Sequence, residues 1–172
     1  EFRRVLFRSW LYGVRNFFPR EWEAFAGHVP AEERGDLLGA YTRRLESADP
    51  AVYLPAARAW SRYEGACLHL RPQPETADAF AEDAVALGIG RLEAHYFRHR
   101  AFLRPGQLLE DMPRIRHLPG VIVHGRYDVI CPPRYAHALA DAWPGVQLRM
   151  VTEAGHSSME PGIAAELVAA TD

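Results

Sequence analysis

The sequence has 172 residues, a formal net charge of −2 and a hydrophobic fraction of 48%. This length suffices for one sizeable core, and the near-neutral charge gives no broad electrostatic case for binding nucleic acid or an anionic membrane. No apolar run approaches the roughly 18 residues that a membrane span needs. The two cysteines, Cys67 and Cys131, make no disulfide framework, so a reducing, cytoplasmic location is expected.

The amino-terminal stretch EFRRVLFRS is basic and apolar and follows no helical or strand period. It does not lead into the pattern that follows it. We therefore expect residues 1–9 to be a non-native lead-in, with a genuine lead-in helix as the alternative.

Residues 10–104 show helical spacing and no strand-like alternation. Proline opens or precedes successive helices, because it is tolerated in the first helical turn. The predicted starts lie at Pro19, Pro30 and Pro50. We also expect a helix over 76–87, a break at Gly88 and Gly90, and a further helix over 91–100.

Residues 105–172 change to an alternation of strands and helices. An apolar run at 121–123 predicts a buried strand, and a second strand is predicted to begin at Val146. A helix opened by Pro132-Pro133 separates them, and a last helix is expected over 160–171 with Ser158 as a possible cap. The fold class is therefore α/β: a helical domain over 10–104 followed by two strand–helix units of a parallel sheet over 105–172.

Two polar residues follow the two predicted strands. Asp128 lies just beyond the first strand and His156 just beyond the second. Since loops after the carboxyl ends of parallel strands share one sheet edge, we expect these side chains to face each other. An Asp that accepts the His Nδ1–H leaves Nε2 free to take a proton from a nucleophile, which predicts catalytic roles for Asp128 and His156. Taken singly, each could instead be a turn or capping residue.

The nucleophile of such a site is missing from the sequence. Nucleophilic serines of this kind lie in G-x-S-x-G, and none of Ser9, Ser47, Ser61, Ser157 and Ser158 does. We therefore expect the chain to be the carboxyl-terminal part of a larger enzyme, inactive by itself.

The sequence from Trp10 onward resembles prolyl aminopeptidases, also called proline iminopeptidases, which are serine exopeptidases of the α/β-hydrolase superfamily. The motifs that carry the resemblance are WLY…FFPREWEAF, DLLGAYTRRL, AARAWSRYE, RLEAHYF, HGRYDVICP and AGHSSMEPGI. The resemblance implies that residues 10–104 form a helical cap domain, and that residues 105–172 are the last two βα units of the hydrolase domain. It further implies release of amino-terminal proline from peptide substrates, without metal or organic cofactor.

The resemblance also assigns substrate-binding residues. Glu64 and Glu93 would bind the free α-amine of the substrate, whose pKa is about 7.7–8.0. Two carboxylates would hold the ammonium form and reject internal peptides, which lack that charge. Phe97 and Cys131 would line the pocket for the proline ring.

Three alternatives remain open at this stage. A related α/β-hydrolase, such as an esterase or an epoxide hydrolase, would share Asp128 and His156 but would not need the two glutamates. His95 and His99, four residues apart, have the spacing of zinc ligands on one helix face. The chain could also be a fragment without function, whose exposed apolar faces would promote self-association.

Overall fold

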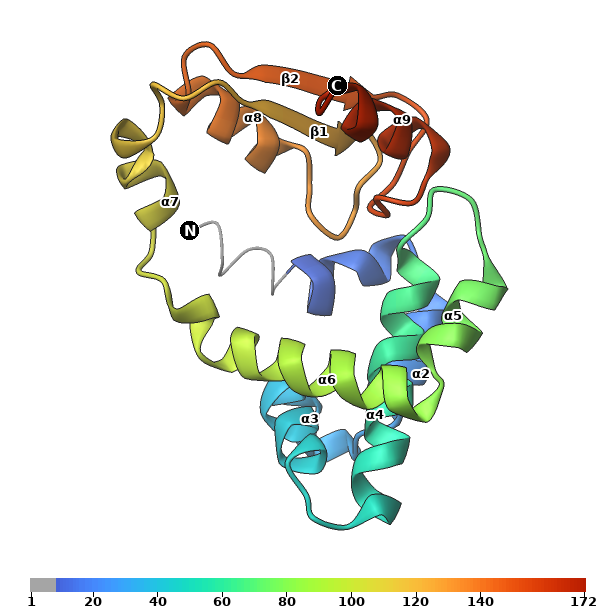
Figure 1. Ribbon diagram of the computed structural model, residues 1–172. Coiled ribbons are helices and arrows are strands. Elements are labelled where there is room, and N and C mark those ends of the chain that lie inside the picture. The colour runs from blue at the N-terminus through green and yellow to red at the C-terminus, as the bar shows by residue number, and fades with distance from the viewer. Residues whose placement is uncertain (1–8) are drawn as a thin grey trace. The chain divides into compact units, whose positions relative to one another are not determined.

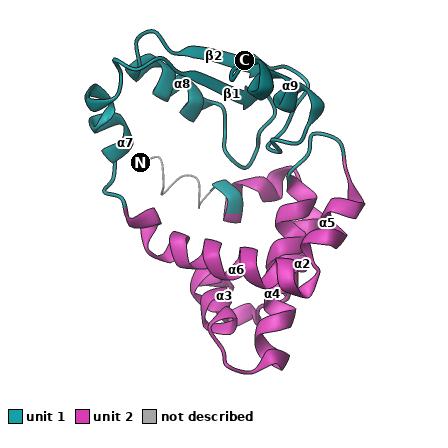
Figure 2. Ribbon diagram, viewed as in Figure 1, with its two compact units in different colours: residues 1–10, 68–71, 103–172 teal, residues 11–67, 72–102 magenta. Residues whose placement is uncertain are grey.

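The computed structural model describes residues 9–172, and its chain divides into two compact units (Figure 2). The helical unit comprises Leu11–Cys67 and Pro72–Phe102, and the α/β unit comprises Leu68–Arg71 and Leu103–Asp172 together with Ser9 and Trp10. Eight of the nine residues of the expected lead-in lie outside the described part. None of the helices over residues 9–172 is both long and apolar enough to span a bilayer.

Five α-helices build the helical unit (Figure 1). They are α2 (Pro19–Gly27), α3 (Leu37–Leu45), α4 (Pro50–Cys67), α5 (Pro74–Phe80) and α6 (Asp83–Arg98). Short helical turns cover Ser9–Gly13, Val14–Asn16, Ala31–Asp36 and Arg100–Phe102. The predicted starts at Pro19 and Pro50 are the first residues of α2 and α4, whereas Pro30 opens the short turn that leads into α3.

Aromatic side chains from three helices form the core of the helical unit. Phe25 stacks on Tyr41 and on Tyr63, with ring centroids 4.5 and 4.7 Å apart, and Trp60 meets Tyr41 edge-on at 5.3 Å. All four side chains are at most 2% exposed. The Tyr41 hydroxyl donates to the Phe25 carbonyl at 2.7 Å, which satisfies its polar end inside the core.

The predicted break at Gly88 and Gly90 is wrong. The chain breaks earlier, at Ala81 and Glu82, and α6 continues through both glycines. Gly90 is buried, and a Cβ there would lie 3.2 Å from the Leu45 side chain on α3. This glycine lets two helices pack closely and does not end one.

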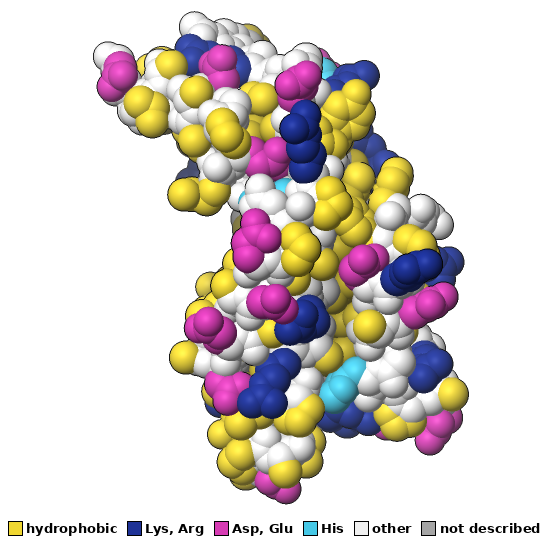
Figure 3. All heavy atoms as spheres, turned by 90° about the vertical axis from the view of Figure 1, so that its right-hand side faces the viewer, with side chains coloured by type: hydrophobic (Ala, Val, Ile, Leu, Met, Phe, Trp, Pro, Cys, Tyr) yellow, Lys and Arg dark blue, Asp and Glu magenta, His cyan; other side chains and the backbone are white. Residues whose placement is uncertain are grey.

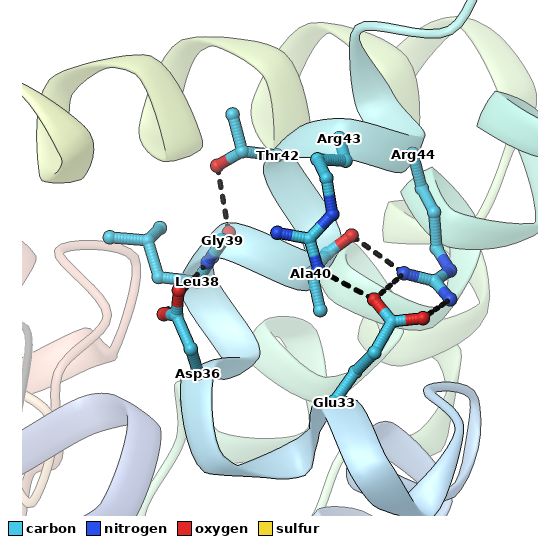
Figure 4. A network of polar contacts seen from close by, with 8 residues as sticks. All are labelled: Glu33, Asp36, Leu38, Gly39, Ala40, Thr42, Arg43 and Arg44. Atoms are coloured by element: carbon cyan, nitrogen blue, oxygen red, sulfur yellow. Dashed lines mark hydrogen bonds and ion pairs between the residues drawn. The ribbon is translucent and has the colours of Figure 1, made fainter.

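The start of α3 is fixed by polar contacts (Figure 4). Asp36 is the N-cap residue, and its carboxylate accepts the Gly39 N–H at 3.0 Å. Glu33, in the preceding turn, reaches Arg43 and Arg44 at 2.6 and 2.8 Å. These hydrogen bonds, that with Arg44 first, lower the pKa of Glu33 to about 2.

The α/β unit contains a parallel pair of strands, β1 (Val121–Gly125) and β2 (Gln147–Val151), in the register Val121↔Gln147 to Gly125↔Val151. Helix α8 (Arg134–Ala142) connects them, α9 (Pro161–Ala169) follows β2, and α7 (Gln107–Glu110) and the turn Met112–Arg114 precede β1. Strands 121–125 and 147–151 and the final helix therefore agree with the prediction, and this mixture of helices with a small parallel sheet is that of an α/β-hydrolase part. Ser158 is not the cap, because Glu160 occupies the N-cap position of α9.

Candidate active site

The Asp loop, Arg126–Cys131, follows β1 and folds around the carboxylate of Asp128. One oxygen, Oδ1, accepts the N–H groups of Ile130 and Cys131 at 3.0 and 2.7 Å. Asp favours this turn because its short side chain reaches the backbone two or three residues on. The side chain is only 5% exposed, and these bonds leave Oδ2 directed elsewhere.

His124 on β1 supports the same loop from the strand. Its Nε2–H donates to the Cys131 carbonyl at 2.8 Å and lies 3.5 Å from Asp128 Oδ2. Because a carbonyl only accepts, this contact fixes the proton on Nε2 of His124. Both ends of the Asp loop are thereby tied to β1.

The His loop, Ala154–Glu160, follows β2 and approaches the Asp loop closely. Tyr127 N–H donates to the Ala154 carbonyl at 2.9 Å, and Arg126 N–H donates to the Val151 carbonyl at 2.8 Å. Gly125 lies at the closest point, where an added Cβ would overlap the Gly155 carbonyl. A glycine at the end of β1 therefore permits the two loops to meet.

The structure brings Asp128 and His156 together. His156 Nδ1–H donates to Asp128 Oδ2 at 2.9 Å, and the His156 side chain keeps 30% of its surface exposed. A carboxylate that accepts Nδ1–H selects the tautomer with an unprotonated Nε2 whenever the ring is neutral. The pair can therefore exchange a proton through an imidazole that remains partly accessible.

The environment of His156 also sets its charge. Burial alone lowers its pKa, but hydrogen bonding to Asp128, followed by that to Cys131, outweighs burial and raises the pKa from 6.5 to about 10.

Within residues 9–172, no serine hydroxyl is hydrogen-bonded to His156. Ser157 is buried, with its hydroxyl accepting the Met159 N–H, and Ser158 is exposed.

Cys131 lies beside this pair, so the site offers three kinds of metal-ligating atom. The ligand atoms of Asp128, Cys131 and His156 all lie within 4.8 Å of one another. The Asp128 oxygens are already engaged by two backbone amides and an imidazole. Only Cys131 and His156 then remain as metal ligands, fewer than the three or four protein ligands of a zinc site. Cys67 and Cys131 are both free thiols.

The predicted amine-binding carboxylates lie on two packed helices of the helical unit. Glu93 on α6 accepts the indole N–H of Trp60 on α4 at 2.7 Å. Glu64 is four residues after Trp60, and therefore one turn along the same face of α4. Phe97, one turn after Glu93, lies with its ring centroid 6.2 Å from that of Trp60. Trp60 thus binds the Glu93 carboxylate, lies beside Phe97 and precedes Glu64 by one helical turn.

The His95 and His99 rings lie 4.4 Å apart on the exposed surface of α6 and its end. His99 Nδ1–H donates to the His95 carbonyl at 2.9 Å, and the His99 ring stacks on Phe102 at 5.2 Å. Among residues 9–172, neither belongs to a group of three metal-ligating side chains. Their arrangement is that of a helix end covered by an aromatic ring.

Three contributions were missed in the sequence analysis: His124 and Glu160 in the α/β unit, and Trp60 in the helical unit as a partner of Glu93. Glu160 is 8% exposed, and its Oε1 accepts the Gly155 N–H at 2.8 Å. Glu160 directly before Pro161 predicts only a helix start, since acidic residues are common there. Its contact with the His loop depends on the folded backbone.

Comparison with known proteins identifies relatives along almost the whole chain. No family model matches. The chain is 45% identical to a probable proline iminopeptidase of Leptolyngbya boryana over 166 residues, 95% of this chain and 52% of that protein. It is 44% identical to the proline iminopeptidase of Xanthomonas citri over 167 residues, 95% and 53% of the two proteins. It is 42% identical to that of Arabidopsis thaliana over 168 residues, 95% and 44%.

The chain thus spans about half the length of the curated relatives it matches. The match includes both the helical unit and the α/β unit, because it covers 95% of the chain. By sequence and by its mixed helical and parallel-strand structure, the chain is a homologue of the proline iminopeptidases over a segment of about half their length.

Proposed function

We propose that this chain carries the acid and the base of a prolyl aminopeptidase, together with the groups that bind the substrate's free amine. The nucleophilic serine and the oxyanion-binding amides would come from an amino-terminal part of the polypeptide outside this sequence. The observation that carries the proposal is the 2.9 Å hydrogen bond between His156 Nδ1 and Asp128 Oδ2. The printed names of the relatives support the choice of substrate.

In the proposed reaction, the serine Oγ attacks the carbonyl carbon of an amino-terminal prolyl residue while His156 Nε2 takes the hydroxyl proton. Asp128 keeps Nδ1–H oriented and stabilises the imidazolium that forms. The tetrahedral intermediate collapses when His156 returns the proton to the leaving amine. Water then hydrolyses the acyl-enzyme by the same proton transfers, and proline leaves.

Glu64 and Glu93 would bind the substrate's ammonium group. Trp60 holds one oxygen of the Glu93 carboxylate, which leaves the other available to a cation. Phe97 would contact the proline ring as a flat apolar group and Cys131 as a small one. These four roles rest on the resemblance, and the contacts of Glu93 and Phe97 with Trp60 support two of them.

The raised pKa of His156 has a kinetic consequence. A general base acts in its neutral form, so at a pH below its pKa the rate falls with the neutral fraction. We expect the acid limb of the pH–rate profile to lie above pH 6.5, the ordinary value for histidine.

The test is a chimera in which the unmatched amino-terminal part of the Xanthomonas citri protein is joined to residues 10–172. It should release proline from a prolyl arylamide. His156→Ala and Asp128→Asn should each lower kcat/KM by about 10³-fold or more. A fully active Asp128→Asn chimera would overturn the assignment of the acid.

A second set of variants tests whether Glu64 and Glu93 bind the substrate's amine. Glu64→Gln and Glu93→Gln should lower kcat/KM for the arylamide by about 10- to 100-fold, the strength of a charged hydrogen bond, and leave a simple aryl ester little affected. Glu23→Gln, on an exposed position of α2, is the matched control. Equal losses on both substrates would argue against the amine-binding role, and no activity on either would favour an inactive fragment.

A further inference from the structure

A short segment outside the two loops holds the backbone of His156. We call residues Leu68–Arg71, which directly follow α4 in the chain, the strap. The Leu68 carbonyl accepts the N–H groups of His156 and Ser157, at 2.9 and 3.0 Å. The amide of the proposed base is therefore fixed by a residue far away in sequence and within the same compact unit.

Glu160 joins the strap to the His loop from the other side. Its Oε1 accepts the Gly155 N–H at 2.8 Å and the Leu70 N–H at 3.2 Å. Two backbone groups, one from each segment, thus converge on one carboxyl oxygen that is shielded from water. Such a buried acceptor is costly to lose, because its removal leaves both N–H groups without their partner.

The side chain of Glu160 does not perform the usual task of its position. A residue at an N-cap normally directs its side-chain oxygen to the first amides of its own helix. Glu160 makes no such bond to α9, although its backbone carbonyl accepts the Ala164 N–H at 2.9 Å. Its carboxyl group is used for the His loop and the strap instead.

Gly155 shows how closely the two segments pack. A Cβ at Gly155 would lie 2.9 Å from the Leu70 nitrogen and 3.2 Å from the His69 carbonyl carbon. Both neighbours are backbone, which cannot move aside as a flexible side chain would. The contact between strap and His loop therefore requires a glycine immediately before His156.

We propose that Glu160 is a positioning residue for His156, acting through the amides of Gly155 and Leu70 and together with the Leu68 carbonyl. The inference rests on the proposed function only in calling His156 the base. It assigns the His loop three restraints: Asp128 on the imidazole, Leu68 on the His156 amide, and Glu160 on the preceding amide. It also makes the placement of His156 depend on the strap, whose first residue is four positions after Glu64.

The experiment uses the ¹⁵N-labelled chain and needs no substrate. Gly155 and Leu70 amide exchange and the His156 Nδ1–H resonance are followed by NMR in wild type, Glu160→Gln and Glu160→Met. Glu160→Gln keeps a carbonyl oxygen and should preserve all three signals. Glu160→Met fills similar space without an acceptor, so both amides should exchange at least about tenfold faster and the Nδ1–H signal should broaden or vanish.

The matched control is Glu153→Met, a change at an exposed position just before the His loop, which should alter none of these signals. Unchanged exchange and an unchanged Nδ1–H signal in Glu160→Met would overturn the proposal. If Glu160→Met does not fold, amide exchange in the wild type provides the test. Gly155 and Leu70 amides that exchange as fast as those of exposed loops would also overturn the proposal. These readouts are independent of peptidase activity, so a failed chimera assay would reject the proposed function and leave the positioning role standing.

Discussion

At the scale of single residues, Asp128 organises the site because its carboxylate accepts hydrogen bonds from both loops. Oδ1 closes the turn of its own loop, and Oδ2 receives His156 Nδ1–H from the other loop. The positions of Asp128 and His156 could be predicted from the sequence, because each directly follows a strand. The contributions of His124, Leu68 and Glu160 could not, because they bind backbone groups whose positions only the fold defines.

The pH dependence of stability tests the bond between Asp128 and His156. A group whose pKa rises on folding, here from 6.5 to about 10, stabilises the fold fully below pH 6.5 and loses that contribution as the pH approaches 10. We therefore expect the free energy of unfolding, measured by urea denaturation, to fall across this range. Asp128→Asn should flatten the dependence, because the hydrogen bond to Asp128 contributes most to raising the pKa of His156. An equally steep fall in Asp128→Asn would contradict the assignment.

Gly125 gives a second prediction at this scale. Gly125→Ala would force a Cβ into the Gly155 carbonyl, so we expect a loss of about 1–3 kcal/mol of stability, typical of overpacking. The control is Gly88→Ala on α6, where a Cβ meets nothing within 4 Å. That change should be neutral or stabilise by about 0.5–1 kcal/mol, because alanine favours the helix. Thermal unfolding of both variants measures the difference, and equal melting temperatures would refute the close approach.

At the scale of elements, proline predicts helix boundaries in this chain better than glycine does. Pro19, Pro50 and Pro161 each begin a helix, because a missing N–H is harmless in the first turn. The predicted helix break at Gly90 is wrong because this glycine serves helix packing. The Leu45 side chain occupies the space that a Cβ would take. Local propensity does not reveal whether a glycine ends a helix or accommodates a neighbouring one.

The polar contacts at the start of α3 give a prediction for acid conditions. The pKa of Glu33 falls on folding from 4.5 to about 2, so its contribution is present above pH 4.5 and is lost as the pH falls toward 2. Glu33→Gln should therefore be less stable than wild type above pH 4.5, and the two should converge near pH 2. Glu46→Gln, which breaks an exposed pair with Arg98, should change little. Helical circular dichroism during denaturation measures both, and a constant difference over this range would disprove a stabilising role for the contacts of Glu33 with Arg43 and Arg44.

At the scale of the whole molecule, charged side chains of both signs are mixed, whereas the α/β unit leaves large apolar side chains exposed. Acidic and basic side chains are interspersed on the face drawn in Figure 3, in keeping with the small net charge. Large apolar side chains of the α/β unit remain exposed, including Leu108, Ile115 and Leu118 at 42–50%. The residues of β1 and β2 are mostly only partly buried, although parallel sheets are usually covered on both faces. The predicted burial of the strand at 121–123 is therefore wrong, because these three residues are only partly buried within the chain.

This uncovered surface predicts self-association of the isolated chain. Leu108, Met112, Ile115, Leu139 and Trp143 line an apolar hollow of about 540 Å³ in the α/β unit. Exposed apolar surface of this kind favours association in water, so the weight-average mass by light scattering should rise with protein concentration. Leu108→Glu with Ile115→Glu should reduce the rise, because charges at the rim oppose burial. Val52→Glu changes a similarly exposed apolar residue of the helical unit and should leave it unchanged. A monomer at all concentrations with a cooperative thermal transition would show instead that the α/β unit is stable with this surface in water.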